Sequence, residues 1–167
     1  VKGVHVLAEA MRFIRDPRLE VKIYGDLTRA PDYAQRLRSV IGADPRITLA
    51  GTYTGIDGLS DVLAETDVIV VPSLWYENSP TVLLEAFALK TPAIVSDFGG
   101  MAELVQDEVS GLRFKLGDPV DLAGKLQLLL DSPAMLDQIT AGVPEVRSVG
   151  DEMAALETTY DQILARS

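Results

Sequence analysis

Two short apolar runs constrain the fold of this chain more than any other feature. Residues 67–71 (DVIVV) are apolar after the first position and end at Pro72, and residues 92–96 (PAIVS) form a second such run. A strand that is apolar at successive positions is buried on both faces, as in a parallel sheet covered by helices. The runs therefore predict an α/β protein.

Helical patterns separate these two runs from three further predicted strands. We expect strands at 19–24, 46–50, 67–71, 92–96 and 112–115, and helices at 3–14, 31–41, 56–65, 80–89, 101–105, 118–130 and about 150–166. The last helix carries Met153, Leu156, Tyr160 and Leu164 on the side that we expect to be buried. Strands and helices that alternate in this way favour a Rossmann-like, doubly wound parallel sheet, and 167 residues fit one domain.

Composition excludes several classes of function. The chain has 25 acidic and 15 basic residues, and its net charge of −10 disfavours nucleic acid as a partner. It has no cysteine and one histidine, His5, which stands at a helix start, so neither a thiolate site nor a multi-histidine metal site is expected. No apolar run of about 18 residues and no signal sequence is present, which predicts no transmembrane segment. A cysteine-free chain fits a reducing compartment, and we expect a cytoplasmic location.

The stretch PSLWYENSPTVLLEAFALKTP, residues 72–92, follows a predicted strand, where open parallel sheets bind their ligands. Ser79 is a predicted N-cap and Pro80 the first helical residue. This arrangement leaves the amides of Thr81 and Val82 unpaired. With the positive end of the helix dipole, these amides predict a phosphate-binding seat.

Two carboxylates flank this seat. Glu85 is one turn into the helix, on the face of Thr81, where it can accept hydrogen bonds from two vicinal hydroxyls. Glu77 lies in the preceding loop, beside the phosphate. Taken singly, an exposed glutamate or a Ser-Pro helix start is more often only structural. Their coincidence at one sheet edge favours a binding site in which the two carboxylates do not act as a catalytic pair.

The segment ENSPTVLLEA, which contains Glu77 and Glu85, resembles the E-x7-E signature of retaining GT-B glycosyltransferases, in glycosyltransferase family 4 (glycosyl transferases group 1). Further segments resemble the family in the same order: VKG, DVIVVPS, TPAIVSDFGG and ELVQDEVSGLRF. The resemblance covers most of residues 2–130. It implies one half of a GT-B fold, which binds a nucleoside-diphosphate sugar and transfers the sugar with retention of configuration, without a metal or other cofactor.

The resemblance also implies roles for single residues. Glu77 would be the catalytic residue that contacts the donor sugar, Lys2 would contact the diphosphate, and Glu85 would bind the ribose hydroxyls. The remaining donor-binding positions would be the amides of Asn78, Ser79, Thr81 and Val82, and the ring of Tyr53 packed on the base.

The chain departs from the family at three places. Ser79-Pro80 stands where the family often has Phe-Gly. Lys90 stands where glycine is common, and a left-handed backbone there would add strain of about 1 kcal/mol. The chain begins at Val1, so the family's first strand, which ends in Gly-Arg and is central in its sheet, is expected to be missing. Either a neighbouring piece of chain supplies that strand, or the sheet is rearranged.

The resemblance further implies that residues 1–167 are a donor domain whose partner is an N-terminal acceptor domain of the same parent chain. The fragment alone is then expected to be inactive, and the full-length enzyme to be cytoplasmic or at the inner face of a membrane. The helix at about 150–166 would pack on its own sheet, which we favour, or face the other domain. In the second case the isolated chain could self-associate.

Two alternative functions remain open at this point. One is a non-catalytic nucleotide-binding or regulatory Rossmann-like module, which the lack of a G-x-G-x-x-G fingerprint disfavours. The other is a GT-B epimerase or phosphorylase, for which one would expect more catalytic histidines than His5 or a cofactor lysine pocket. The base, the sugar and the acceptor cannot be deduced from the sequence.

Overall fold

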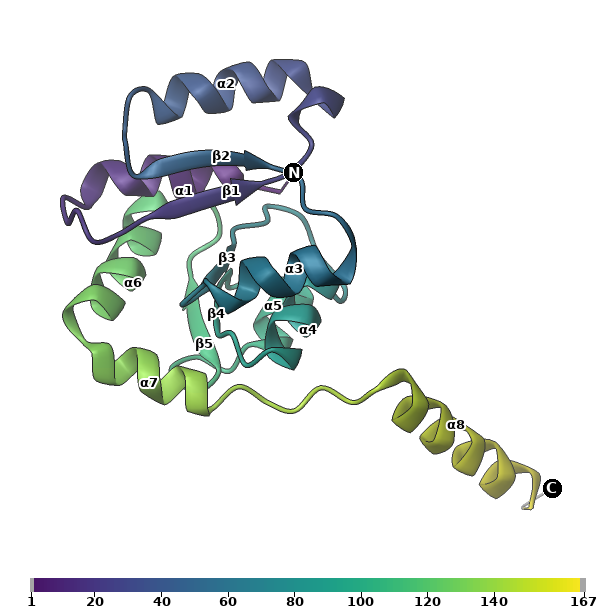
Figure 1. Cartoon of the computed structure of the whole chain (residues 1–167). Helices are drawn as coiled ribbons and strands as arrows, with labels where there is room; N and C mark the ends of the chain where they lie inside the picture. The colour runs from purple at the N-terminus through teal and green to yellow at the C-terminus, as the bar shows by residue number, and fades with distance from the viewer. Residues whose placement is uncertain (1, 166–167) are drawn as a thin grey trace.

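Strands and helices alternate along almost the whole chain. The computed structural model describes residues 2–165, and Figure 1 shows their arrangement. The strands are β1 (Val21–Tyr24), β2 (Ile47–Gly51), β3 (Ile69–Val71), β4 (Ala93–Ser96) and β5 (Gly111–Phe114). The α-helices are α1 (Val4–Ala10), α2 (Pro31–Ile41), α3 (Gly55–Ala64), α4 (Thr81–Ala88), α5 (Gly99–Leu104), α6 (Pro119–Asp131), α7 (Pro133–Ala141) and α8 (Val149–Leu164), with 3-10 turns η1 (Met11–Phe13) and η2 (Leu27–Arg29).

The predicted α/β class with parallel strands is confirmed. All five predicted strands are present within two residues of their predicted bounds, and α2 has the bounds that were predicted. Helix α7 was not predicted. The strands form two parallel sheets, β1-β2 and β3-β4-β5, instead of one continuous sheet. The interruption falls between β1 and β3, and residues of both strands line one cavity.

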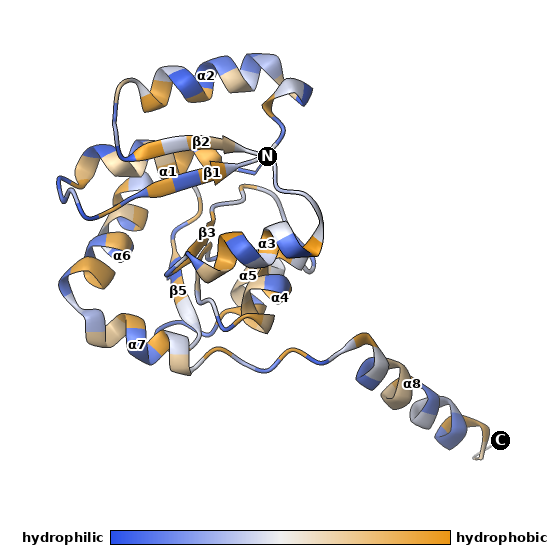
Figure 2. Cartoon of the chain, in the orientation of Figure 1, coloured by the Kyte–Doolittle hydropathy of each residue, from blue (hydrophilic) through white to orange (hydrophobic). Residues whose placement is uncertain are grey.

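Helices cover both faces of the sheet at strand β4. All of its residues are buried. Ile94 packs with α1 and α6 on one face, whereas Ala93 and Val95 pack with α4 and α5 on the other. In Figure 2, β3 is apolar along its length and β1 alternates between apolar and polar residues. The apolar runs are thus core strands, as the sequence predicts.

Two helix ends follow local chemistry. The side chain of Asp118 accepts hydrogen bonds from the amides of Val120 and Asp121, at 2.9 and 3.1 Å, and caps α6 as predicted. Lys90, just after α4, has φ +60°, so the left-handed backbone considered for this position is present. Its amide donates to the carbonyl of Phe87, which closes the helix end.

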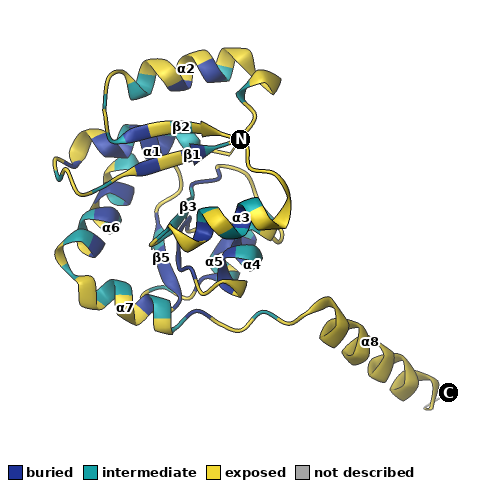
Figure 3. Cartoon of the chain, viewed as in Figure 1, coloured by how far each residue is buried: buried dark blue, intermediate teal, exposed yellow. Residues whose placement is uncertain are grey.

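The prediction that α8 buries one side is wrong. Met153, Leu156, Tyr160 and Leu164 are between 43% and 72% exposed, and Figure 3 shows α8 exposed along its length, in contrast to β5. A capping box of Ser148 and Asp151 starts the helix locally. The segment 142–148 leads α8 away from the sheets (Figure 1), so an amphipathic pattern forms without a covering layer. Residue 166, predicted as part of this helix, lies outside the described residues.

Candidate functional site

Except for Tyr53, the predicted site residues come from segments near the carboxyl edge of the β3-β4-β5 sheet. The loop of residues 72–80 follows β3, and the loop of residues 97–98 leads from β4 into α5. Lys2 precedes α1 and reaches the same edge. Ligands of open parallel sheets bind at this edge, because the loops that follow neighbouring strands converge there.

Glu77 is held by two side chains. Its Oε1 atom accepts a hydrogen bond from Lys2 Nζ at 2.7 Å and another from Ser73 Oγ at 3.0 Å. The Lys2 hydrogen bond is the main reason why the pKa of the Glu77 carboxyl lies below its ordinary value, with burial opposing the shift and Ser73 adding to it. The side chain of Glu77 is 17% exposed and that of Lys2 is 71% exposed. Glu77 is therefore an ionised, oriented acceptor beside a cation that reaches solvent.

Gly3 brings Lys2 to this position. It has φ +65°, and a Cβ atom built on it would lie 1.7 Å from the carbonyl oxygen of Pro72. Only glycine permits both this backbone and this approach. The Lys-Gly pair is thus explained by close packing of the start of α1 on the residue that ends β3.

Gly100 holds the loop that contains Glu77 from the other side. Its amide donates to the carbonyl of Glu77 at 2.8 Å, and a Cβ atom on it would lie 1.7 Å from the carbonyl oxygen of Asn78. Next to this contact, the rings of Tyr76 and Phe98 meet edge to face, with centroids 5.4 Å apart. The backbone before α4 is therefore positioned by the loop after β4.

The start of α4 differs by one residue from its prediction. The N-cap is Pro80, in an extended conformation, and no side chain caps the helix, so the prediction of Ser79 as N-cap is wrong. The φ of Pro80, −69°, suits a helix as well as a cap, but its ψ of 113° is extended, so Thr81 is the first helical residue. Thr81 and Val82 still carry the first amides of the helix, as expected, because the amide of Leu83 already donates to Pro80.

The other predicted residues are spread over a wider area. Glu85 is half-buried in α4, and its side chain has no hydrogen-bond partner within residues 2–165. Asn78 and Ser79 are exposed. Tyr53 belongs to the loop after β2, where its ring meets Tyr24 edge to face with centroids 6.0 Å apart. The structure thus brings Lys2 directly to Glu77. Tyr53 instead lies at the β1-β2 sheet, where it contacts Tyr24.

Sequence reasoning did not identify two serines at this edge. Ser73 donates a hydrogen bond to Glu77. The signal in the sequence was a serine at the end of an apolar run, with a glutamate four residues later. Ser96 ends β4, and its Oγ atom is buried with no hydrogen-bond partner in the described part of the chain. His5 contacts Tyr33 of α2, with 3.1 Å between its ring nitrogen and the tyrosine oxygen.

Two searches of the described chain gave negative results. Among residues 2–165, no three histidine, cysteine or acidic side chains are grouped so that they could hold a metal ion. Within the same residues, no helix has the length and apolar character needed to cross a membrane.

Solved structures show which fold this arrangement belongs to. A structure of Anabaena HepE in complex with UDP and glucose matches 96% of this chain and 45% of its own, with a TM-score of 0.80 and 21% identity. A glycosyltransferase from Rickettsia africae matches 99% of this chain and 45% of its own, with a TM-score of 0.81 and 22% identity. At this identity the likeness shows the fold, a Rossmann-like half of a GT-B glycosyltransferase.

Curated relatives match at higher identity. An uncharacterized glycosyltransferase of Methanocaldococcus jannaschii is 34% identical over 114 residues, which cover 66% of this chain and 28% of that protein. A D-inositol 3-phosphate glycosyltransferase of Arthrobacter is 32% identical over 139 residues, which cover 80% of this chain and 32% of that protein. The chain thus spans about a third of the length of these relatives. The family model for glycosyl transferases group 1 matches residues 1–132. The chain belongs to the glycosyl transferases group 1 family.

Proposed function

We propose that this chain is the nucleotide-sugar-binding, C-terminal part of a retaining glycosyltransferase of family 4. The observation that carries the proposal is the hydrogen-bonded group of Lys2, Ser73 and Glu77 beside the N-terminus of α4. It combines a cation, an ionised acceptor and unpaired helix amides at the edge where such sheets bind ligands. The similar HepE structure, which holds UDP and glucose, supports a donor of this class.

In this proposal the diphosphate lies between Lys2 and the start of α4. The amides of Thr81 and Val82 donate to phosphate oxygens, and those of Asn78 and Ser79 serve the sugar and phosphate. Glu85, one turn further, accepts hydrogen bonds from the ribose hydroxyls. Its half-buried carboxylate has no partner in the described residues, so it is available for this role. Tyr53 packs on the base.

The proposed reaction breaks the bond between the anomeric carbon and the diphosphate oxygen, and forms a bond from the same carbon to an acceptor oxygen on the same face. The acceptor proton passes to the departing diphosphate. Negative charge grows on that diphosphate, so Lys2 and the helix amides stabilise the transition state more than the ground state. Glu77 contacts the sugar, and its lowered pKa keeps it in the accepting, ionised form. No metal or other cofactor takes part.

The acceptor substrate requires a second domain. We propose that an N-terminal domain of the same parent chain binds it, that the present chain alone does not turn over, and that the enzyme works in the cytoplasm or at the inner face of a membrane. The relatives are about three times as long as their match to this chain, which leaves room for such a domain.

Titration of the 167-residue chain with UDP, GDP and ADP in EDTA, followed by calorimetry, tests the donor role. We expect one nucleotide to bind selectively without metal, and Glu85→Gln to weaken it by about 10- to 100-fold, because hydrogen bonds to a charged group contribute about 1.5–3 kcal/mol. Glu157→Gln, on the exposed helix α8, is the matched control and should bind like the parent chain.

Equal binding by the Glu85→Gln variant would contradict the role of Glu85. The donor role of the isolated chain would be contradicted if none of the three nucleotides bound to it. The sample must unfold cooperatively in the same test, which shows that it is folded.

A further inference from the structure

Ser73 and Lys2 bind the same oxygen of Glu77, but the two side chains differ in how firmly they are held. Ser73 is fully buried just after β3, and its Oγ atom lies 3.0 Å from Glu77 Oε1. Lys2 Nζ lies 2.7 Å from the same oxygen, and the lysine side chain is 71% exposed. The serine is thus part of the packed structure, whereas the lysine is free to move in solvent.

The direction of the serine hydrogen bond follows from charge. The Glu77 carboxyl has a lowered pKa and is ionised at neutral pH, so it can only accept, and the Ser73 hydroxyl donates to it. The Oγ atom of Ser73 in turn accepts a hydrogen bond from the amide of Trp75, at 3.4 Å. The hydroxyl therefore has one orientation, with its proton toward Glu77.

The second carboxylate oxygen of Glu77, Oε2, is open. Both side-chain hydrogen bonds go to Oε1, and within residues 2–165 Oε2 has no partner. In the described part of the chain, Ser96 Oγ is the one buried side-chain polar atom without a partner, so Oε2 is not enclosed. Oε2 therefore reaches solvent at the carboxyl edge of the sheet, where ligands bind.

The main chain of Glu77 is fixed as well. Its carbonyl accepts a hydrogen bond from the amide of Gly100 at 2.8 Å, and a Cβ atom built on Gly99 would lie 3.1 Å from the same carbonyl oxygen. The loop after β4 thus holds the backbone while Ser73 holds Oε1. Oε2 has a defined place before a ligand arrives, and binding to such a group costs less side-chain entropy.

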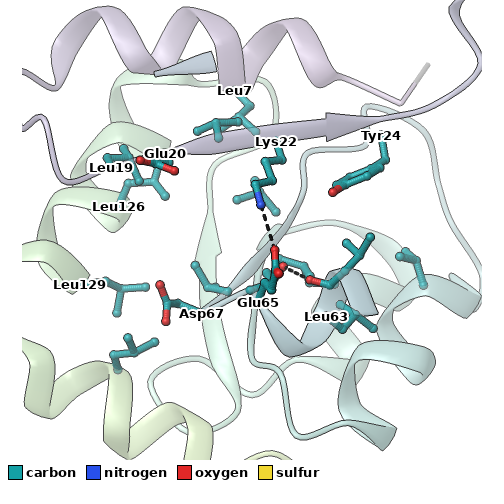
Figure 4. A pocket seen from close by; sticks show the side chains of 18 of the residues that line it. Leu7, Leu19, Glu20, Lys22, Tyr24, Leu63, Glu65, Asp67, Leu126 and Leu129 are labelled. Atoms are coloured by element: carbon teal, nitrogen blue, oxygen red, sulfur yellow. Dashed lines mark hydrogen bonds and ion pairs between the residues drawn. The ribbon is translucent and has the colours of Figure 1, made fainter. Parts of the chain in front are cut away.

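Another lysine–glutamate pair shows what the serine adds. Lys22 Nζ lies 3.2 Å from Glu65 Oε2, across a cavity that both residues line (Figure 4). Their side chains are 49% and 74% exposed, and within residues 2–165 no further group bonds to the Glu65 carboxylate. Such an exposed pair orients its glutamate weakly, because solvent competes for both charges. Glu77 is 17% exposed and keeps a buried hydrogen bond when its lysine moves.

The proposed donor competes with Glu77 for the lysine. A diphosphate between Lys2 and the start of α4 attracts the ammonium group, because several charged phosphate oxygens then face it. Lys2 consequently holds Glu77 less firmly when the donor is bound. Ser73 is buried, so its hydrogen bond to Glu77 is unaffected by this movement.

We propose that Ser73 is a positioning residue for the donor sugar. It keeps Oε1 of Glu77 fixed while Lys2 serves the diphosphate, so that Oε2 accepts a hydrogen bond from one hydroxyl of the sugar. Glu77 then recognises the sugar through a single oriented oxygen atom. This inference rests on the proposed donor-binding function of the chain.

NMR titration of the Glu77 side-chain carboxyl carbon tests the orienting contact without a ligand. In the 167-residue chain, Ser73→Ala should raise the pKa of Glu77, because the Ser73 hydrogen bond contributes to its depression. Ser110→Ala is the matched control: Ser110 is also buried, and its Oγ atom accepts one hydrogen bond, from the Gln106 amide. This control should leave the pKa of Glu77 unchanged.

Calorimetric titration with UDP, GDP and ADP, and with the glucose conjugate of each, tests the role in sugar binding. For the nucleotide that binds, Ser73→Ala should weaken the glucose conjugate about 3- to 10-fold relative to the parent chain, as expected for one hydrogen bond. The free nucleotide should bind the Ser73→Ala variant and the parent chain equally, because it lacks the sugar that Glu77 contacts. Ser110→Ala should bind both ligands like the parent chain.

Three outcomes would overturn the inference. An unchanged pKa of Glu77 in the folded Ser73→Ala variant would show that Ser73 does not orient the carboxylate. Equal weakening of the free nucleotide and of its glucose conjugate would show that Ser73 supports the fold of the site and does not position the sugar contact. Failure of every nucleotide to bind the parent chain would contradict the donor function and with it the sugar contact, while the NMR titration would still decide whether Ser73 orients Glu77.

Discussion

The Nζ atom of Lys2 lies 2.7 Å from Oε1 of Glu77, although 75 positions separate the two residues in the sequence. Gly3 and the end of β3 make this contact possible, because Gly3 allows the start of α1 to pack on Pro72. The contact joins the first residues of the chain to the loop before α4, where the donor is proposed to bind.

Replacement of Lys2 should be visible in the titration of Glu77. We expect Lys2→Met to raise the pKa of Glu77 toward its ordinary value of 4.5, because the hydrogen bond from Lys2 is the largest cause of its depression. NMR titration of the Glu77 side-chain carboxyl carbon measures this change. Lys125→Met, in α6, is the control and should leave the pKa of Glu77 unchanged.

The same contact predicts a pH dependence of stability. A carboxyl whose pKa is lower in the folded state stabilises the fold above its unfolded value of 4.5, and this contribution is lost as the pH falls through the folded pKa. The parent chain should therefore lose more unfolding free energy between about pH 6 and pH 3 than the Lys2→Met variant. Urea unfolding at both ends of the range measures the difference, and parallel curves would contradict the prediction.

The close approach of Gly100 to Asn78 predicts a large response to one methyl group. Gly100→Ala should lower the unfolding free energy by about 1–3 kcal/mol, because the added Cβ would overlap the Asn78 carbonyl. Gly124→Ala is the matched control in α6, where a Cβ meets no atom within 4 Å, and it should raise stability by about 0.5–1 kcal/mol. Urea denaturation compares the two, and an equal effect would refute the overlap.

The left-handed backbone of Lys90 predicts a stabilising substitution. Lys90→Gly should raise the unfolding free energy relative to Lys90→Ala by about 1 kcal/mol, because only glycine adopts φ +60° without strain. Both variants remove the hydrogen bond from Lys90 Nζ to the Val143 carbonyl, so their difference isolates the backbone. Equal stability of the two variants in thermal unfolding would contradict this account.

The exposure of α8 predicts that it contributes little to the stability of the elements from α1 to α7. A chain that ends after Arg147 should melt within about 3 °C of the full chain, because α8 buries none of its described residues. Ile139→Ala, in the neighbouring α7, removes a fully buried side chain and should cost about 2–5 kcal/mol. A large loss of stability on truncation would mean that α8 packs on the preceding elements.

Sedimentation of the full and the truncated chain tests the predicted self-association through α8.

Features that depend on neighbours in the sequence were predictable. The apolar run before Pro72 predicts β3, the helix 31–41 has the expected bounds, and Asp118 caps α6. Each of these depends on a period of hydrophobicity or on a side chain that bonds to backbone two or three residues away. Glu77 and Glu85 were also predicted in this way, because their spacing forms part of a local signature, and their roles stay predictions.

Features that depend on distant contacts were decided by the tertiary structure. The sequence shows an amphipathic α8 but not whether anything covers it, since a pattern defines a face and not its partner. It shows five strands but not the interruption between β1 and β3, because strand pairing is a long-range choice. Lys2 and Gly100 meet the loop of Glu77 only through packing between separate elements. The sequence by itself therefore determined the five strands and most of the helices, whereas the tertiary structure decided which of them touch, because contacts between distant segments leave no local pattern.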